Sequence, residues 1–275
     1  MTVLAAGTAA RRVSSTLGAY LGLIVLVAIV VALVTVGFFP ARRWEPFGDV
    51  RVWQFLGRGL LVTAQIGVVS LLASVALSLP LAIGRTALPR PLRWIVVAWI
   101  ELLRATPVLA LILGATLFMP RTRLDIEPVW AATIGLTAYN SAVIAEFVRA
   151  GILSIPRGEV DAARSLGLSY LKTMRLVVLP QAISRMMPAI VSQCITLVKD
   201  TSLASIAAVS ELVGYARSSW VFYGNVAETL FVIACIYFVI NYSLSRLARR
   251  LELRQPKEER VVVPAGLDQE TGRYL

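Results

Sequence analysis

The chain contains 275 residues, of which 57% are hydrophobic and 16% are charged, and its formal net charge is +11 at pH 7. This composition excludes an ordinary water-soluble domain and predicts a membrane protein. Because the chain has no histidine and only two cysteines, the sequence predicts no His-based catalytic site and no metal site.

Six apolar runs follow one another along the chain, and each covers or nearly covers the ~30 Å hydrocarbon core, which takes about 20 helical residues. They comprise residues 17–39, 59–84, 94–119, 129–145, 186–209 and 229–245. We interpret the first as a retained helix, since no small-residue cleavage site follows it. The third contains Glu101 and Arg104, and the fifth contains Lys199 and Asp200. The sequence therefore predicts an all-α integral membrane protein with six transmembrane helices.

The basic residues favour an orientation with both termini in the cytoplasm, because about two thirds of them then lie on the cytoplasmic side. Four arginines between residues 42 and 58 oppose this bias, although the aromatic residues beside them are typical of an interfacial segment. Basic residues spread between apolar runs also argue against a nucleic-acid partner. Residues 1–55 are expected to hold the cytoplasmic N-terminus, an extra first helix and an external loop, and residues 251–275 a polar cytoplasmic tail.

The segment at about 156–180 is the longest cytoplasmic segment in this orientation. Pro156 is suited to open a short helix, and Glu159 and Asp161 favour its first turn. Gly167 is a helix stop, and a second amphipathic stretch is expected to end at Pro180. Since a membrane span needs no such element, we interpret it as a docking surface for a cytoplasmic partner; the alternative is an ordinary interfacial loop.

The same segment resembles the EAA motif of bacterial ABC importer permeases. The matching residues are Asp161-Ala162-Ala163, Gly167, Val177 and Leu179-Pro180, with Asp and Val in place of the usual Glu and Ile. The resemblance implies the type I ABC importer permease fold, with a coupling helix that fits a groove on a separate ATPase. The residues implied in coupling are Glu159, Asp161, Ala162, Ala163, Gly167, Leu179 and Pro180.

Three further segments resemble importers of polar amino acids: residues 101–109, residues 139–151 and residues 197–203. The resemblance covers roughly residues 56–250, which would form a five-helix core. It implies a bacterial cytoplasmic membrane protein with an ABC ATPase dimer, a second permease subunit, identical or homologous, and an extracytoplasmic solute-binding protein as partners. No phosphate-binding Gly-x-x-x-x-Gly-Lys-Ser/Thr stretch occurs, so ATP and magnesium are expected on the ATPase, with no cofactor on this chain.

The polar residues inside the apolar runs are the candidates for a substrate path. Glu101 and Arg104, three residues apart on one helix face, are interpreted as a structural ion pair in preference to a substrate contact. Lys199 and Asp200 point about 100° apart, so each is expected to find a different partner. The substrate-path candidates are Asn140, Ser141, Gln193, Lys199, Asp200, Thr201 and Ser202. The neutral amide of Gln193 suits glutamate or glutamine first and basic amino acids second.

Two other classes of protein account for part of the pattern. A self-sufficient ion-coupled transporter or channel would explain the intramembrane charges but not the docking segment. A membrane scaffold would explain neither. The sequence thus favours the permease subunit of an ATP-driven importer.

Overall fold

The computed structural model describes residue 37 and residues 40–122 and 125–252, and all elements in that part of the chain are helical. The apolar run at 17–39 lies outside the described residues except for Gly37, as does nearly all of the 251–275 tail. The α-helices are α2 (Val50–Ala87), α3 (Arg90–Ala105), α4 (Val108–Phe118), α5 (Pro128–Leu153), α6 (Arg157–Ser165), α7 (Tyr170–Thr173), α8 (Leu179–Asp200), α9 (Leu212–Tyr223) and α10 (Val226–Glu252). The shorter elements are the 3-10 helices η1 (Ala41–Gly48), η2 (Met119–Arg121) and η4 (Thr201–Ala207) and the π-helix η3 (Met174–Val178).

Four helical segments are long and apolar enough to cross a membrane, and a bent pair makes up to five in the described residues. The four are Val50–Ala87, Pro128–Leu153, Tyr170–Ala207 and Val226–Leu247. These correspond to four of the predicted runs. The sixth predicted helix, at 17–39, stays a prediction because it lies outside the described residues.

The prediction of one continuous helix over 94–119 is wrong. The segment breaks into α3 and α4, which are bent by 99° with respect to each other. Pro107 lacks the N–H that a helix needs and disfavours helical backbone at the preceding residue, and Thr106 accordingly has an extended ψ of 128°. The composition of the run is apolar on both sides of the break, so hydropathy alone does not reveal it.

The prediction that Pro180 ends an amphipathic stretch is also wrong. Pro180 is the second residue of α8, and the helical path runs from Tyr170 to Ala207 without interruption. A proline inside a continuous helical path leaves a carbonyl of the preceding turn without its usual N–H donor. The π-helical turn η3 immediately before it changes the hydrogen-bond register, so the chain continues into α8.

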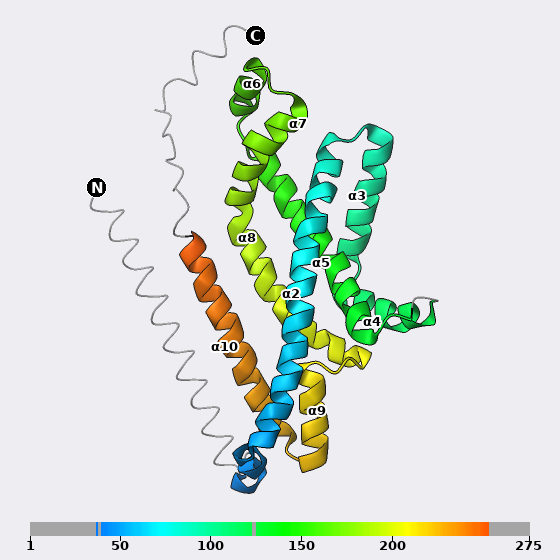
Figure 1. The fold of residues 1–275 in the computed structure, drawn as a ribbon, viewed down its shortest axis with the longest axis vertical. Coiled ribbons are helices and arrows are strands. Elements are labelled where there is room, and N and C mark those ends of the chain that lie inside the picture. The colour runs from blue at the N-terminus through cyan, green and yellow to red at the C-terminus, as the bar shows by residue number, and fades with distance from the viewer. Residues whose placement is uncertain (1–36, 38–39, 123–124, 253–275) are drawn as a thin grey trace, which may run out of the picture.

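The helix α5 lies at the centre of the fold, between α2, α4 and α8 (Figure 1). Two of its glycines allow this close packing, because a Cβ at Gly135 would lie 2.8 Å from the Leu111 carbonyl oxygen and one at Gly151 only 2.6 Å from that of Ala182. Ser70 and Ser74 of α2 donate hydrogen bonds to carbonyl oxygens of α5, both at 3.3 Å. Small residues and hydroxyl groups are the usual means of close helix contact in membranes.

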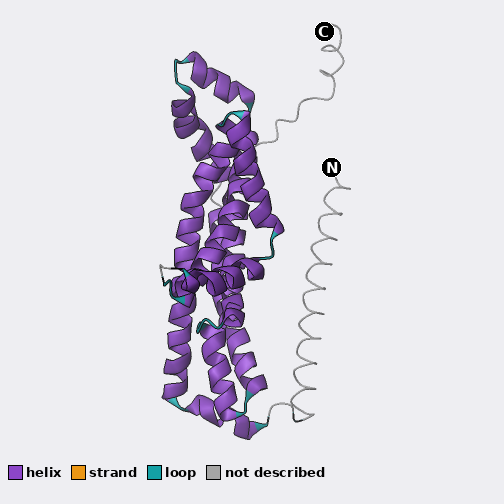
Figure 2. Ribbon diagram, turned by 90° about the vertical axis from the view of Figure 1, so that its right-hand side faces the viewer, coloured by secondary structure: helices purple, strands orange, loops and turns teal. Residues whose placement is uncertain are grey.

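The long helices run along one axis and separate two ends of the molecule (Figure 2). The helices α6 and α7 lie at one end, and η1 and α9 lie at the other (Figure 1). We refer to residues 154–181 as the α6–α7 end.

Candidate functional site

The helix α6 has a defined stop at its C-terminus. Gly167 has a φ of +80°, and its N–H donates to the Arg164 carbonyl at 2.9 Å while the Leu168 N–H donates to the Ala163 carbonyl at 3.3 Å. These two bonds form a Schellman motif, in which the left-handed residue is normally glycine. The helix stop that the sequence predicts at Gly167 is therefore present.

The inner face of the α6–α7 end is held against the start of α8. Ala163 is buried, and Ile155, Met174 and Val178 form a small buried apolar cluster at the same end of the molecule. The Gln181 side-chain amide donates a hydrogen bond to the Glu159 carboxylate. Arg185 donates to the Ser154 carbonyl at 2.7 Å, which ties α8 to the end of α5. Of the motif residues, Glu159 and Ala163 thus serve packing within the chain.

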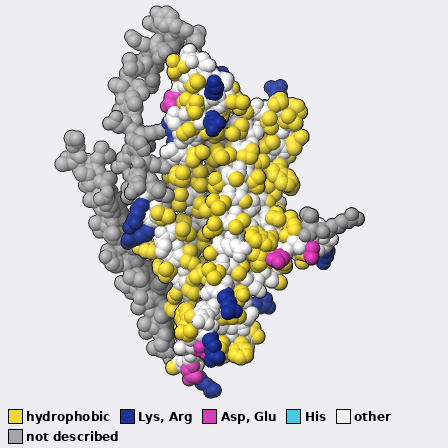
Figure 3. Space-filling model, in the orientation of Figure 1, with side chains coloured by type: hydrophobic (Ala, Val, Ile, Leu, Met, Phe, Trp, Pro, Cys, Tyr) yellow, Lys and Arg dark blue, Asp and Glu magenta, His cyan; other side chains and the backbone are white. Residues whose placement is uncertain are grey.

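The outer face of this end carries large apolar side chains that no described residue covers. Leu166 is 83% exposed, Leu171 73% and Leu176 62%. Asp161, Ala162 and Pro180 are exposed as well, and Leu179 is half-buried. Basic and hydrophobic side chains lie side by side there, at the upper end in Figure 3. Exposed apolar side chains among charged ones are typical of a surface that binds another protein.

The structure brings together two of the substrate-path candidates in the interior. Asn140 on α5 is fully buried, and its side-chain oxygen accepts a hydrogen bond of 2.9 Å from the Gln193 amide on α8. The Asn140 amide nitrogen in turn donates to the Leu136 carbonyl at 2.8 Å. The pair is neutral, and both helices that carry it run to the α6–α7 end.

The other candidates lie apart from this amide pair. Ser141 is buried and lines an apolar groove between α2, α3 and α5. Lys199 and Ser202 line a cavity of about 340 Å³ together with Tyr237, Phe238 and Asn241 of α10. Thr201 is fully buried, and its hydroxyl donates to the Val198 carbonyl at 2.7 Å. Within the described part of the chain no acidic side chain forms a salt bridge with Lys199, and no basic side chain forms one with Asp200.

Comparison with known proteins decides the family. The family model described as binding-protein-dependent transport system inner membrane component matches residues 74–256. The chain belongs to this family. The resemblance drawn from the EAA spacing is thereby confirmed, and the protein is a permease subunit of an ABC importer for amino acids.

Individual relatives of this permease give the same result. The chain is 39% identical over 207 residues to the probable glutamine ABC transporter permease protein GlnP of Bacillus subtilis, covering 73% of this chain and 94% of the relative. It is 36% identical over 222 residues to the glutamate transport system permease protein GluD of Corynebacterium glutamicum, covering 78% and 81%. A solved amino acid ABC transporter shares the fold with a TM-score of 0.69 at 28% identity, covering 76% of this chain and 98% of that one.

A buried carboxylate that the sequence analysis missed joins three helices of the permease. Glu211 is fully buried and caps α9, where its Oε1 accepts from the N–H groups of Val213 at 2.8 Å and Gly214 at 3.1 Å. Its Oε2 accepts from the hydroxyls of Thr63 on α2 at 3.1 Å and Tyr237 on α10 at 3.3 Å. Burial raises the pKa of the Glu211 carboxyl above its ordinary value, while these donors act in the opposite direction. Glutamate is not a usual N-cap residue, but the positive end of the helix dipole favours an acidic residue at the start of an apolar helix, and that placement would have indicated it.

A charge network with Glu146 at its centre surrounds the predicted pair of Glu101 and Arg104. Arg104 lies 3.7 Å from Glu101, so the two residues do meet. Glu146 on α5 is the less exposed acid, and it accepts from Arg85 of α2 at 2.6 Å and Arg149 at 3.0 Å. Arg85 also reaches Glu101, at 3.1 Å. The network therefore links α2, α3 and α5, and it includes both charges that the sequence placed on α3.

Proposed function

We propose that this permease subunit takes up glutamate or glutamine and that a separate ATPase drives it by docking on the α6–α7 end. The observation that carries the docking part is the exposed outer face of that end. Its leucines are left uncovered while the inner face is fixed to α5 and α8 by the contacts of Glu159 and Arg185. A rigid, partly apolar surface of this kind suits a protein partner whose movement must be transmitted to the spanning helices.

The chemistry of the interior supports the choice of substrate. Asn140 and Gln193 form a neutral, hydrogen-bonded amide pair where α5 and α8 meet. Amide groups both donate and accept hydrogen bonds, so this pair is suited to a side-chain carboxylate or amide of the solute. A basic amino acid would be better served by a carboxylate. The relatives named for glutamine and glutamate point to the same class.

The proposal extends to the partners and to the topology. A solute-binding protein would deliver the amino acid at the η1 and α9 end, and a second permease copy or homologue would complete the path. Both termini would be cytoplasmic, with the run at 17–39 as a sixth helix. ATP and magnesium would bind to the partner ATPase.

Uptake into proteoliposomes tests the substrate. We expect the complex of permease, ATPase and binding protein to accumulate labelled glutamate or glutamine in preference to arginine. Gln193→Glu should abolish glutamate uptake, because two like charges at ~4 Å repel by about 4 kcal/mol at an effective dielectric constant near 20. Arginine uptake should tolerate the change better, and ATP hydrolysis without substrate should be unaltered.

The matched control is Gln193→Met, which keeps the length of the side chain without adding charge. An unchanged preference for glutamate in Gln193→Glu would show that the residue serves helix packing only. Preferred uptake of arginine by the unaltered permease would contradict the substrate assignment while leaving the importer function in place.

A further inference from the structure

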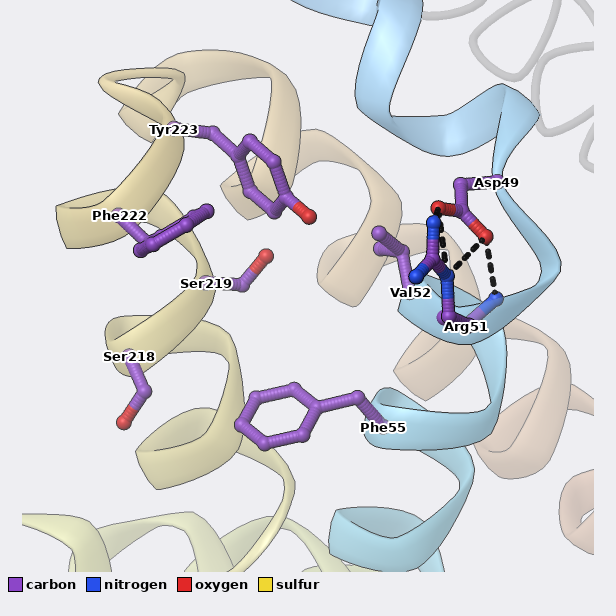
Figure 4. Close-up of a pocket in the computed structure, with 8 residues that line it drawn as sticks. All are labelled: Asp49, Arg51, Val52, Phe55, Ser218, Ser219, Phe222 and Tyr223. Carbon is purple, nitrogen blue, oxygen red and sulfur yellow. Dashed lines mark hydrogen bonds and ion pairs between the residues drawn. The ribbon is translucent and has the colours of Figure 1, made fainter.

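A second cavity lies at the end of the molecule opposite α6 and α7. It has a volume of about 600 Å³ and opens between the start of α2 and α9 (Figure 4). This size falls within the ~300–1,000 Å³ that is usual for small-molecule sites. We call it the α2–α9 pocket. It is lined among others by Asp49, Arg51, Phe55, Ser219, Phe222 and Tyr223.

One hydroxyl group in the α2–α9 pocket is buried without a partner. Ser219 is only 5% exposed, and its Oγ has no hydrogen bond. Figure 4 shows this hydroxyl turned from α9 into the space in front of Arg51 and Tyr223. Buried polar groups are nearly always hydrogen-bonded, so an unpartnered one that faces a cavity indicates a place for a ligand atom.

A pair of opposite charges lies at the rim of the same pocket. The Asp49 carboxylate accepts from the backbone N–H of Arg51 at 2.8 Å and lies 2.9 Å from its guanidinium. Hydrogen bonds from Arg51 lower the pKa of Asp49, so the carboxylate stays ionised near neutral pH. The Arg51 side chain is 87% exposed, so its guanidinium can contact a ligand while it stays paired with Asp49. An anion and a cation side by side match the two charged groups of a free amino acid.

The surroundings of the pocket are basic. A neighbouring cavity shares Asp49 and Tyr223 with it and is lined by Arg42, Arg43 and Glu45. Charged side chains of both signs gather at this lower end in Figure 3. Three arginines against two carboxylates leave an excess of positive charge, which favours a ligand with one more carboxylate than ammonium group.

We propose that the α2–α9 pocket is a second binding subsite for a free α-amino acid, with a preference for a dicarboxylic one. The ammonium group binds Asp49 and the α-carboxylate binds Arg51 and the Ser219 hydroxyl. The aliphatic part packs on Phe55 and Phe222, and the second carboxylate lies toward Arg42 and Arg43. This inference rests on the proposed function, since the pocket lies at the end where the solute would arrive if the ATPase docks on the α6–α7 end.

Thiol protection tests the site directly. Ser218→Cys, in a Cys194→Ala, Cys235→Ala background, places a reporter on an exposed residue that lines the pocket. The purified permease–ATPase complex in nanodiscs is treated with a maleimide, with and without glutamate, glutamine or arginine. We expect glutamate to slow the reaction severalfold, glutamine to do so at higher concentration, and arginine to have no effect.

A matched pair of arginine variants completes the experiment. Arg51→Gln should raise the glutamate concentration for half-maximal protection about tenfold, the usual size for one charge-assisted hydrogen bond. Arg58→Gln removes the same charge from an exposed position of the same helix outside the pocket, and it should leave that concentration unchanged. Absence of protection, equal protection by arginine, or an equal effect of both variants overturns the proposal.

Uptake by the same cysteine variant separates this inference from the proposed function. If proteoliposomes accumulate glutamate while glutamate gives no protection, the pocket proposal fails and the importer function stands. If the unaltered complex accumulates no amino acid, both the proposed function and the subsite proposal are wrong.

Discussion

Truncation to alanine should destabilise this permease far more at Glu211 than at Glu228, although both glutamates are buried. Glu211 and Glu228 are both 0% exposed, so truncation to alanine removes the same atoms from a closed environment in each case. Glu211 accepts four hydrogen bonds, whereas both carboxylate oxygens of Glu228 have no partner among the residues that the structure describes. A comparison of the two alanine variants therefore separates the contribution of hydrogen bonding to stability from the cost of the cavity that each truncation leaves.

The expected difference can be worked from these contacts. Each bond to Glu211 contributes about 1 kcal/mol net, so Glu211→Ala should lose about 4 kcal/mol beyond the cavity cost that both variants share. Glu228→Ala loses no bond and removes an unsatisfied buried group, which regains about 1–3 kcal/mol. At about 2–4 °C per kcal/mol, the midpoint of Glu211→Ala should lie on the order of 10 °C or more below that of Glu228→Ala.

Thermal unfolding of the detergent-solubilised permease, followed by the fluorescence of its 6 tryptophans, measures this difference. Both variants are prepared with the same detergent and lipid, since bound lipid shifts the midpoint. Equal midpoints, or a lower one for Glu228→Ala, would refute the reasoning that the contacts of Glu211 hold α2, α9 and α10 together.

Three further predictions address coupling, topology and pH. Gly167→Val should uncouple ATP hydrolysis from uptake in proteoliposomes, because a side chain at a φ of +80° costs about 1 kcal/mol or more. The control Gly167→Asn, whose side chain tolerates this backbone, should retain most coupling. Full coupling in Gly167→Val would contradict docking at the α6–α7 end. In a Cys194→Ala, Cys235→Ala background, Glu127→Cys should react with an impermeant thiol reagent from outside and Ser169→Cys only after permeabilisation; the reverse pattern would invert the topology. The raised pKa of Glu211 means that the folded state holds the carboxyl proton more tightly than the unfolded state does. The stability of the fold should therefore decrease as the pH rises above the ordinary pKa of 4.5. The thermal midpoints of wild type and Glu211→Gln across pH 4.5–8 measure this effect, and parallel plots of midpoint against pH would contradict it.

Structural features that depend on local sequence could be predicted, whereas contacts between residues far apart in the sequence could not. Hydropathy is sufficient for α2, α5 and α10, because a run of about 20 apolar residues has few alternatives to a membrane helix. The stop at Gly167 follows from glycine's access to left-handed backbone, which is again local. The bend at Pro107 could be suspected from the proline, but its angle of 99° depends on how α4 packs against α5.

The opposite outcome at Pro180 shows why proline alone does not decide a helix end. Both prolines lack the same N–H, yet only Pro107 breaks its helix. At Pro180 the preceding π-helical turn changes the hydrogen-bond register, and Met174 and Val178 of that turn are buried in the cluster with Ile155. Packing thus keeps Pro180 within a continuous helix, whereas Pro107 lies at a break. A single sequence does not show which side chains will pack beside each proline.

The charge and amide contacts show the same dependence on distance along the chain. The partner of Arg85 lies 61 residues away, at Glu146, and that of Gln193 lies 53 residues away, at Asn140. Helical spacing indicates the ion pairs that share a helix, Glu101 with Arg104 and Glu146 with Arg149, because the two residues of each pair lie three positions apart. It gives no sign of a partner on another helix. Asn140 and Gln193 were recognised as polar residues inside apolar runs, whereas Arg85 was placed just outside one. In each case the partner depended on which helices cross.

The crossing of α5 and α8 gives these separate features a common mechanical basis. Both helices leave the α6–α7 end, and at a rise of ~1.5 Å per residue Asn140 and Gln193 lie about 20 Å along them from Leu153 and Leu179. Near that end the helices are in backbone contact, since a Cβ on Gly151 would lie 2.6 Å from the Ala182 carbonyl oxygen. A pair of helices in such contact can slide or rotate but cannot separate without losing its packing. A displacement of α6 by a docked partner would therefore reach the Asn140–Gln193 hydrogen bond as a relative movement of α5 and α8. A neutral hydrogen bond is suited to break and re-form during such a movement, because leaving its buried partners unsatisfied costs about 1–3 kcal/mol, less than the loss of a buried ion pair.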